Sequence, residues 1–173
     1  AEVAQFQWLG HAGDGWHAMI RVQLEDFDVG TELAKLSDGN LGVGGVCSFV
    51  GLVRDMTKDG KIGAMTLEHY PGMTEKALAD IDAEAHSRWP LQASLIIHRY
   101  GRLEPGDRIV LVAAASAHRE AAFEACHFLI DYLKTRAPFW KLEQTGTGGK
   151  WVDARDDDDA AARRWHSVNK AAE

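Results

Sequence analysis

A predicted helix ends and an extended segment begins within Tyr132-Leu133-Lys134-Thr135-Arg136-Ala137-Pro138-Phe139-Trp140-Lys141. Proline disfavours helical geometry in the residue before it, so the helix that carries Lys134 is predicted to end near Ala137. The next residues leave in extended form, and Lys134 and Lys141 then reach one corner from two elements. Such a corner suits an anionic ligand. Cations in the last helical turn also complement the helix dipole, which accounts for Lys134 and Arg136 but not for Lys141. This stretch alone supports the two interpretations equally.

The elements on either side of this stretch predict an α+β domain with a largely antiparallel sheet and flanking helices. Strands are expected at 19–24, 43–54, 62–70, 93–100, 108–115 and 139–143, and helices at 29–36, 73–89, 119–136 and 160–168. A polar tip at 55–61 should turn the second strand into the third, and a glycine-rich loop is expected at 145–149. Elements that mix without regular alternation favour this fold class. Residues 1–18 are predicted to be an N-terminal extension, and residues 19–173 a single domain.

Composition excludes several classes of function. A formal net charge of -7 and a pI near 5.6 argue against a nucleic-acid binder. No apolar run has membrane-spanning length, and the N-terminus lacks the pattern of a signal peptide, so a cytoplasmic protein is expected. Cys47 and Cys126 lie far apart and predict buried thiols. The eight histidines show no metal-ligand spacing, so no metal is expected.

Three further motifs contain cations, and each has a simple structural explanation as well. His118 and Arg119 follow an apolar strand at a helix N-terminus, which attracts anions, but this segment also reads as an ordinary helix cap. Arg54 ends a strand at a turn, where a solvated arginine is common. Arg155 precedes four aspartates, and simple charge balance is the stronger explanation for it in isolation. Taken singly, the simple explanation is favoured for each motif.

Together these motifs resemble a known family. They are Gly51-Leu52-Val53-Arg54, Thr66-Leu67-Glu68-His69-Tyr70-Pro71-Gly72-Met73-Thr74-Glu75-Lys76-Ala77-Leu78, Arg88-Trp89-Pro90-Leu91, Ser116-Ala117-His118-Arg119, Phe123-Glu124-Ala125, the run from Asp131 to Lys141, and Trp151-Val152-Asp153-Ala154-Arg155. The chain from about 43 to 165 closely resembles the large, catalytic subunit of molybdopterin synthase. Residues 20–41 match more loosely, and residues 1–18 do not match. The extra N-terminus and the loop at 144–149, where relatives commonly have a proline-containing turn, depart from the pattern.

The resemblance implies an α/β-hammerhead-like fold and a sulfurtransferase. The family converts precursor Z, a cyclic pyranopterin monophosphate, into molybdopterin during molybdenum cofactor biosynthesis. Sulfur arrives as a thiocarboxylate on the C-terminal Gly-Gly tail of a small ubiquitin-like subunit, with no cofactor. Large subunits form a homodimer with one small subunit at each end, giving a heterotetramer.

The resemblance also implies roles for particular residues. Lys134 and Lys141 should be the catalytic pair, one moving protons and the other holding the developing oxyanion, in either order. The pocket should be lined by Arg54, His118, Arg119 and Arg136, and by Arg155 of the neighbouring subunit. Phe139 and Trp140 are candidate walls for the incoming tail, although plain core packing explains one of them equally well.

Three rival interpretations stay open to test. A non-catalytic module that binds a ubiquitin-like tail would dock the partner without converting precursor Z. A phosphate- or nucleotide-binding protein is opposed by the lack of a glycine loop between strand and helix. A fusion of both subunits is opposed by length, since residues 1–18 cannot hold a ubiquitin-like domain.

Overall fold

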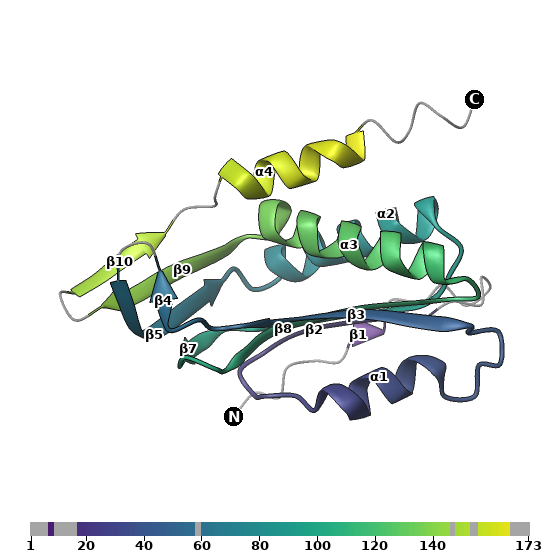
Figure 1. The fold of residues 1–173 in the computed structure, drawn as a ribbon, viewed down its shortest axis with the longest axis horizontal. Coiled ribbons are helices and arrows are strands. Elements are labelled where there is room, and N and C mark those ends of the chain that lie inside the picture. The colour runs from purple at the N-terminus through teal and green to yellow at the C-terminus, as the bar shows by residue number, and fades with distance from the viewer. Residues whose placement is uncertain (1–6, 9–16, 58–59, 146–147, 153–155, 167–173) are drawn as a thin grey trace.

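The computed structural model describes residues 7–8, 17–57, 60–145, 148–152 and 156–166 (Figure 1). They form two antiparallel-rich sheets with helices packed on the larger one. Within these ranges, no helix is both long enough and apolar enough to cross a membrane.

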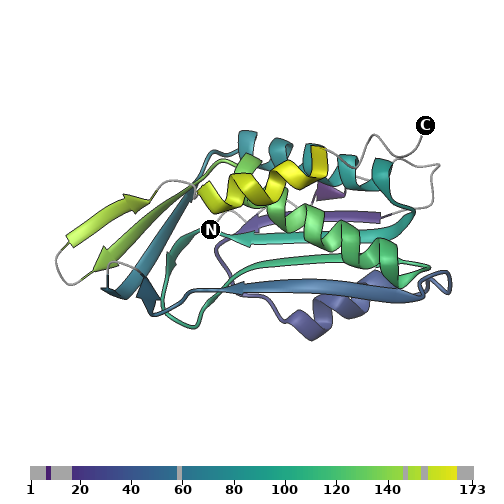
Figure 2. The same cartoon turned by 45° about the horizontal axis from the view of Figure 1, so that its top comes forward.

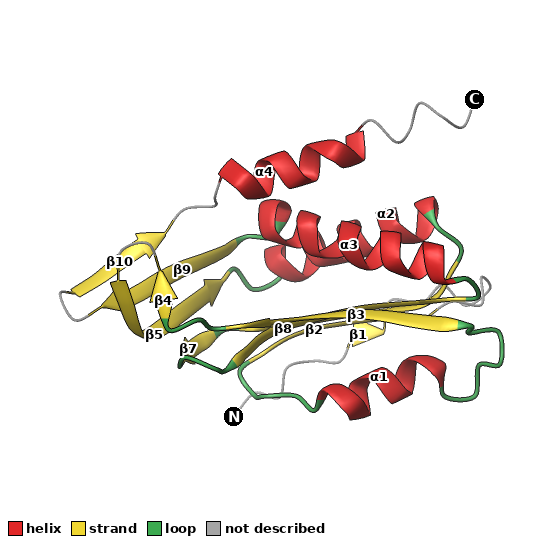
Figure 3. Ribbon diagram, viewed as in Figure 1, coloured by secondary structure: helices red, strands yellow, loops and turns green. Residues whose placement is uncertain are grey.

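The main sheet has five described strands in the order β1-β2-β6-β8-β3. Figure 3 shows this sheet edge-on between the helices. Its strands are β1 (Gln7–Trp8), β2 (His17–Gln23), β6 (Leu91–Arg99), β8 (Arg108–Ser116) and β3 (Gly45–Leu52). β2 runs parallel to β6, and the other pairs are antiparallel. β8 is the apolar centre of the sheet, because its side chains from Val110 to Ala115 are buried on both faces.

Helices cover both faces of the main sheet. α2 (Met73–Arg88) and α3 (Arg119–Arg136) lie on one face, and α1 (Val29–Ser37) lies on the other (Figures 1 and 2). α2 buries Leu78, Ile81 and Ala85 at helical spacing against the sheet. α1 begins where its sequence predicts, since the Asp28 side chain accepts a 2.7 Å hydrogen bond from the Thr31 N–H.

A second sheet stands at the end of the molecule where α3 finishes (Figure 1). Its order is β10-β9-β5-β4, and the short strand β7 also pairs with β5. These strands are β4 (Met56–Thr57), β5 (Gly60–His69), β7 (Gly101–Leu103), β9 (Phe139–Thr145) and β10 (Gly148–Val152). A separate small core joins this sheet to the end of β3, formed by Val53, Met65, Leu67 and Leu103.

The C-terminal elements pack on α3. α4 (Asp156–Arg163) is followed by a 3₁₀ turn (Arg164–His166). The carboxylate of Asp131 on α3 accepts hydrogen bonds from the indole Nε1 of Trp165 at 2.8 Å and from Arg164 at 2.7 Å. This buried anchor fixes the last described turn to the middle of the molecule.

The α+β fold with largely antiparallel sheets is confirmed, but some local expectations are wrong. The strands expected at 43–54 and 62–70 are not partners: β3 pairs with β8, whereas β5 pairs with β4, β7 and β9. Of the glycine-rich loop expected at 145–149, Thr145 ends β9, and Gly148 and Gly149 begin β10, which pairs antiparallel with β9; residues 146–147 lie outside the described residues. Part of the expected N-terminal extension joins the main sheet, since β1 pairs with β2 and β2 begins at His17.

Candidate functional site

The corner predicted around Pro138 is present and is held by a buried threonine. α3 ends at Arg136, and the Ala137 N–H still donates to the Leu133 carbonyl at 3.4 Å. The fully buried hydroxyl of Thr74 donates to the Pro138 carbonyl at 3.1 Å and accepts from the Tyr70 N–H at 3.0 Å. The start of α2 therefore fixes the turn that separates Lys134 from β9.

Three of the expected site residues gather at this end of the molecule. Lys134 is exposed in the last turn of α3, and Lys141 is half-buried on β9 opposite Leu67 of β5. Arg54 is exposed just beyond β3, directly after Val53, which packs in one core with Leu67. Three separate elements thus bring cationic residues to the junction of the two sheets.

Arg136 shares this end but is engaged in structural contacts. Its guanidinium donates to a Glu84 carboxylate oxygen at 2.9 Å and lies over the Tyr132 ring at 4.8 Å. Glu84 also holds Arg88, and both arginines lower the pKa of its carboxyl, although burial opposes them. Arg136 therefore ties the end of α3 to α2.

His118 and Arg119 lie at the opposite end of α3. His118 is the N-cap residue and Arg119 the first helical residue, and both are exposed. At 1.5 Å per residue, Arg119 and Lys134 stand about 22 Å apart along the helix axis. A single chain therefore does not bring His118 and Arg119 together with the two lysines. Arg155, the remaining expected site residue, lies outside the described residues.

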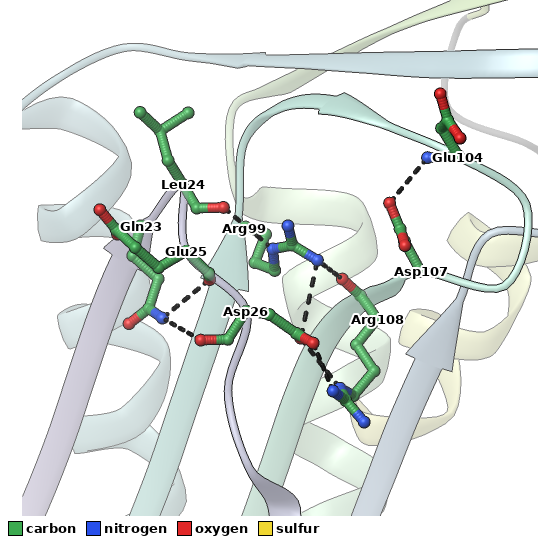
Figure 4. Close-up of polar contacts among 8 residues, drawn as sticks. All are labelled: Gln23, Leu24, Glu25, Asp26, Arg99, Glu104, Asp107 and Arg108. Carbon is green, nitrogen blue, oxygen red and sulfur yellow. Dashed lines mark hydrogen bonds and ion pairs between the residues drawn. The ribbon is translucent and has the colours of Figure 1, made fainter.

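Two arginines near the junction were not singled out from sequence, and both are engaged in structural contacts (Figure 4). Arg99 donates to the carbonyls of Leu24 at 3.1 Å and Arg108 at 3.0 Å. Arg108 forms a two-pronged ion pair with Asp26, which lowers the pKa of that carboxyl to about 2. These contacts hold the segment between β2 and α1 against the ends of β6 and β8. Because Arg99 and Arg108 serve these structural contacts, we do not count them among the candidates for ligand binding.

The two aromatic residues after Pro138 have different environments. Phe139 is half-buried and stacks on His98 with ring centroids 3.7 Å apart, so it belongs to the core. Burial lowers the pKa of His98 to about 4, which keeps this imidazole neutral near pH 7. Trp140 is 41% exposed and meets Tyr70 edge-on at 4.3 Å.

Tyr70 is the residue whose importance sequence reasoning missed. It is 51% exposed, and its ring contacts the exposed ring of Trp140. Met73, the first residue of α2, is 61% exposed. The available signal was the Tyr70-Pro71-Gly72 turn, which gives no role until β5 and β9 are seen to pair. Among the residues that the structure describes, no cluster of His, Cys, Asp and Glu side chains could hold a metal ion.

Comparison with known proteins identifies the family. The family model described as MoaE protein matches residues 22–136. The chain belongs to the MoaE family. The molybdopterin synthase catalytic subunit of Pseudomonas aeruginosa is 60% identical over 146 residues, which cover 84% of this chain and 97% of that protein.

Solved MoaE structures agree with the fold. The molybdopterin biosynthesis MoaE protein from Burkholderia ambifaria superposes with a TM-score of 0.74 at 54% identity, covering 85% of this chain and 97% of that one. The molybdopterin synthase from Staphylococcus aureus superposes with a TM-score of 0.71 at 32% identity, covering 83% and 99%. The MoaE match runs from β2 to the end of α3, so it includes Arg54, Arg119 and Lys134 and stops before Lys141.

Proposed function

We propose that this chain is the catalytic subunit of a molybdopterin synthase, a sulfurtransferase of molybdenum cofactor biosynthesis. The observation that carries the proposal is 60% identity over 97% of a relative with that name. The cations gathered at the junction of the two sheets supply the chemistry that such a reaction needs. The rival interpretation, a non-catalytic module for a ubiquitin-like tail, is the weaker one, because the relatives are named as catalytic subunits.

The proposed reaction converts precursor Z into molybdopterin. A small ubiquitin-like subunit delivers sulfur as a thiocarboxylate on its C-terminal Gly-Gly tail, and two such transfers build the dithiolene. Two catalytic subunits and two small subunits form the heterotetramer. The substrate phosphate and the incoming tail are both anionic, so arginine and lysine side chains suit each of them.

We assign proton transfer to Lys134 and stabilisation of the developing oxyanion to Lys141, and the two tasks can be exchanged. The assignment is supported by placement: Lys134 is exposed at a helix end, whereas Lys141 is half-buried in β9. Charge stabilisation is stronger where water is partly excluded, which favours Lys141 for the oxyanion. Arg54 would hold phosphate at the same junction, and Arg136 would support the site by fixing the end of α3 on α2.

His118 and Arg119 can join this site only from a second copy. In one chain they lie about 22 Å along α3 from Lys134, beyond the reach of any side chain. A homodimer that sets the N-terminal end of one α3 beside the C-terminal end of the other would complete the phosphate site. Arg155 of the neighbouring subunit is proposed to reach the same pocket. The site would then be shared between two subunits.

The exposed, contacting rings of Tyr70 and Trp140 are a candidate contact for the incoming tail. A Gly-Gly terminus lacks side chains and can pass through a narrow channel beside aromatic rings. Of the two aromatic walls expected from sequence, Trp140 keeps this role, and Phe139 packs in the core. A cytoplasmic location stays a prediction from sequence.

The direct test is reconstitution. The chain is mixed with precursor Z and a thiocarboxylated small subunit, and molybdopterin is measured by fluorescence after oxidation. The control replaces the thiocarboxylate by the ordinary carboxylate of the same small subunit. Product that depends on the thiocarboxylate is expected. Binding of the small subunit without any product would establish the docking module instead.

A further inference from the structure

The pairing of β5 with β9 ends at the corner where α3 finishes (Figure 1). His69 and Phe139 are the last partners in this register, and Tyr70 and Pro138 are the next residues along the chain. Antiparallel strands exchange N–H···O=C bonds in both directions, but proline has no N–H to donate. The ladder of direct backbone bonds therefore cannot continue in both directions at Pro138.

The hydroxyl of Thr74 bridges the two segments where the ladder stops. Its Oγ1 accepts a hydrogen bond from the Tyr70 N–H at 3.0 Å and donates one to the Pro138 carbonyl at 3.1 Å. A hydroxyl can fill both roles because it carries one donor and two acceptor lone pairs. Thr74 is fully buried, so water does not compete for either bond. A side chain of α2 thus sets the spacing between the end of β5 and the start of β9.

The backbone around Thr74 is itself held by hydrogen bonds. The Thr74 N–H donates to the Tyr70 carbonyl at 2.9 Å, which returns the bond that the Tyr70 N–H makes to the Thr74 hydroxyl. The Glu75 carboxylate accepts from the Gly72 N–H at 2.6 Å. Gly72 has a φ of 82°, in the region that favours glycine. The turn from Tyr70 to Glu75 is therefore closed, and it presents the hydroxyl in a fixed direction.

We propose that Thr74 is a positioning residue, whose hydroxyl fixes Lys134 and Lys141 relative to each other. Lys134 precedes Pro138 on α3 and Lys141 follows it on β9, so the corner that Thr74 holds is the connection between the two lysines. Thr74 is buried and contacts no substrate in this role. The inference rests on the proposed function, which needs both lysines at one reacting centre.

The effect should fall on turnover rather than on substrate binding. Proton transfer and charge stabilisation need the reacting atoms at hydrogen-bonding distance, and a misplacement of about 1 Å lowers a rate by up to about 10²-fold. The phosphate of precursor Z is assigned to Arg54, which follows β3, and to His118 and Arg119, which begin α3. These residues lie outside the turn that Thr74 holds. Loss of the bridge should therefore lower kcat and leave KM nearly unchanged.

The first experiment removes the hydroxyl and keeps nearly the same side-chain shape. Thr74→Val should lower kcat for molybdopterin formation by about tenfold to 10²-fold, with KM for precursor Z changed less than about twofold. Thr74→Ser keeps the hydroxyl and should stay within about threefold of the wild-type kcat. Rates are expressed per folded enzyme, which far-UV circular dichroism measures well below the melting temperature. A loss of stability alone therefore does not change them.

Thr135→Val is the matched control. The Thr135 hydroxyl donates to the Asp131 carbonyl at 3.1 Å within α3. This variant also loses a threonine hydrogen bond beside Lys134, but it leaves the corner bridged. It should keep the wild-type kcat, and a loss as large as that of Thr74→Val would overturn the proposal.

If Thr74→Val does not fold, Thr74→Ala takes its place in the comparison. Alanine leaves room for a water molecule, which satisfies the two polar groups but does not fix their spacing. A folded variant without the hydroxyl that turns over at the wild-type rate would overturn the proposal. The same conclusion follows if Thr74→Ser is as slow as that variant, or if the change is confined to KM.

A double-mutant cycle tests whether Thr74 acts through the lysines. In the Lys134→Ala background there is no longer a pair of amines to align. Adding Thr74→Val should therefore lower the remaining single-turnover rate by less than about twofold. A second loss as large as that in the wild-type background would mean that Thr74 acts through another group, which overturns the proposal.

Hydrogen exchange separates a failure of this proposal from a failure of the proposed function. The Tyr70 amide should exchange about tenfold or more faster in Thr74→Val than in the wild-type chain, relative to amides in the centre of β8. An unchanged Tyr70 amide would overturn the bridge, whether or not the chain is active. A wild-type chain that makes no molybdopterin would overturn the proposed function and the positioning role with it. An active wild-type chain with a normally active Thr74→Val would overturn the positioning role alone.

Discussion

The two ends of α3 both carry cations, but the helix dipole acts on them with opposite sign. At the C-terminal end, Lys134 and Arg136 lie where the dipole is negative, so the helix itself favours them. At the N-terminal end, Arg119 occupies the first helical position beside His118, where the dipole is positive and disfavours a cation. The energetic difference for each charge is about 0.3–1 kcal/mol.

This difference shows which end is the stronger signal of function. A cation at a helix C-terminus is stabilising and needs no ligand to explain it. An exposed arginine at a helix N-terminus slightly lowers the stability of the helix, so its presence there needs another reason. The proposed reason is the substrate phosphate, which the positive end of the helix and Arg119 would bind together. Five predictions test this contrast.

Replacing the lysine at the C-terminal end should have the largest effect. Lys134→Ala is expected to lower the rate of molybdopterin formation by about 10²–10⁴-fold, the usual contribution of a general acid–base group. Lys134 is exposed, so the melting temperature should barely change. Lys35→Ala on α1 is the matched control and should keep wild-type activity. A Lys134→Ala enzyme with normal turnover would remove this residue from the chemistry.

At the N-terminal end, the expected loss is in binding. Arg119→Ala should raise the KM for precursor Z by roughly tenfold or more, because a charge-assisted contact with phosphate is lost. The turnover number should fall less than KM rises. Steady-state kinetics with the wild-type chain as reference separates the two parameters. A change confined to kcat would place Arg119 at the reacting carbon instead.

The C-terminal end also depends on a buried neutral histidine. The pKa of His98 is about 4 in the folded protein because burial disfavours its charged form, against about 6.5 when unfolded. Below pH 6.5 His98 is protonated in the unfolded state but stays neutral in the folded state. The free energy of unfolding therefore falls as the pH falls from 6.5 to 4. The expected loss between pH 7 and pH 5 is about 2 kcal/mol.

Urea unfolding at the two pH values measures this effect, with His98→Gln as the variant. Burial also lowers the pKa of His86 to about 4, which adds a loss of the same sign. Burial raises the pKa of Asp82 to about 6, which opposes it, since the folded state then binds the extra proton. The difference between the wild-type chain and His98→Gln isolates His98. An identical pH dependence in both proteins would contradict the assignment.

Arg136→Ala should lower stability by about 1 kcal/mol or less. Its ion pair with Glu84 is half exposed and therefore screened by water, and its contact with the Tyr132 ring adds a small amount. Thermal unfolding measures the change. A loss of activity much larger than the loss of stability would show that Arg136 contacts the substrate directly.

The smallest expected effect is a gain in stability. Arg119→Glu replaces a cation by an anion at the positive end of α3, so stability should rise by a few tenths to about 1 kcal/mol. The same variant should lose binding of precursor Z, because two anions would then face each other. Measurements of unfolding and of steady-state kinetics on one sample test the gain in stability and the loss of binding. A destabilised Arg119→Glu would mean that Arg119 has a structural partner.

Local signals predicted much of the fold correctly. The helix from Arg119 to Arg136 has the expected bounds, because apolar residues recur at helical spacing and Pro138 stops it. Asp28 caps α1 as its side chain predicts. The short strands β7 and β10 were not predicted. β7 has three residues and β10 begins with two glycines, and such segments form strands only when a neighbouring strand supplies the hydrogen bonds.

The candidate site was predicted in part for the same reason. Lys134 and Lys141 lie seven positions apart around a proline, so sequence reasoning could place both at one corner. Arg54 joins them only because Val53, just beyond β3, packs in one core with Leu67 of β5. The distance from Arg119 to Lys134 was overlooked, although it follows from the length of the helix that the sequence itself predicts.

The sequence by itself determined the family, the α+β class, the bounds of α1, α2 and α3 to within about one residue, and the residue types available for anion chemistry, since these depend on local spacing and on motifs. The terminal helix was expected at 160–168, whereas α4 spans Asp156–Arg163. Only the tertiary structure decided that β3 and β5 belong to different sheets, that Phe139 is core while Trp140 is surface, and that the cations divide between two ends of α3. The physical reason is that strand pairing and burial depend on residues far apart in the chain, and the free energy of those contacts exists only once the chain has folded.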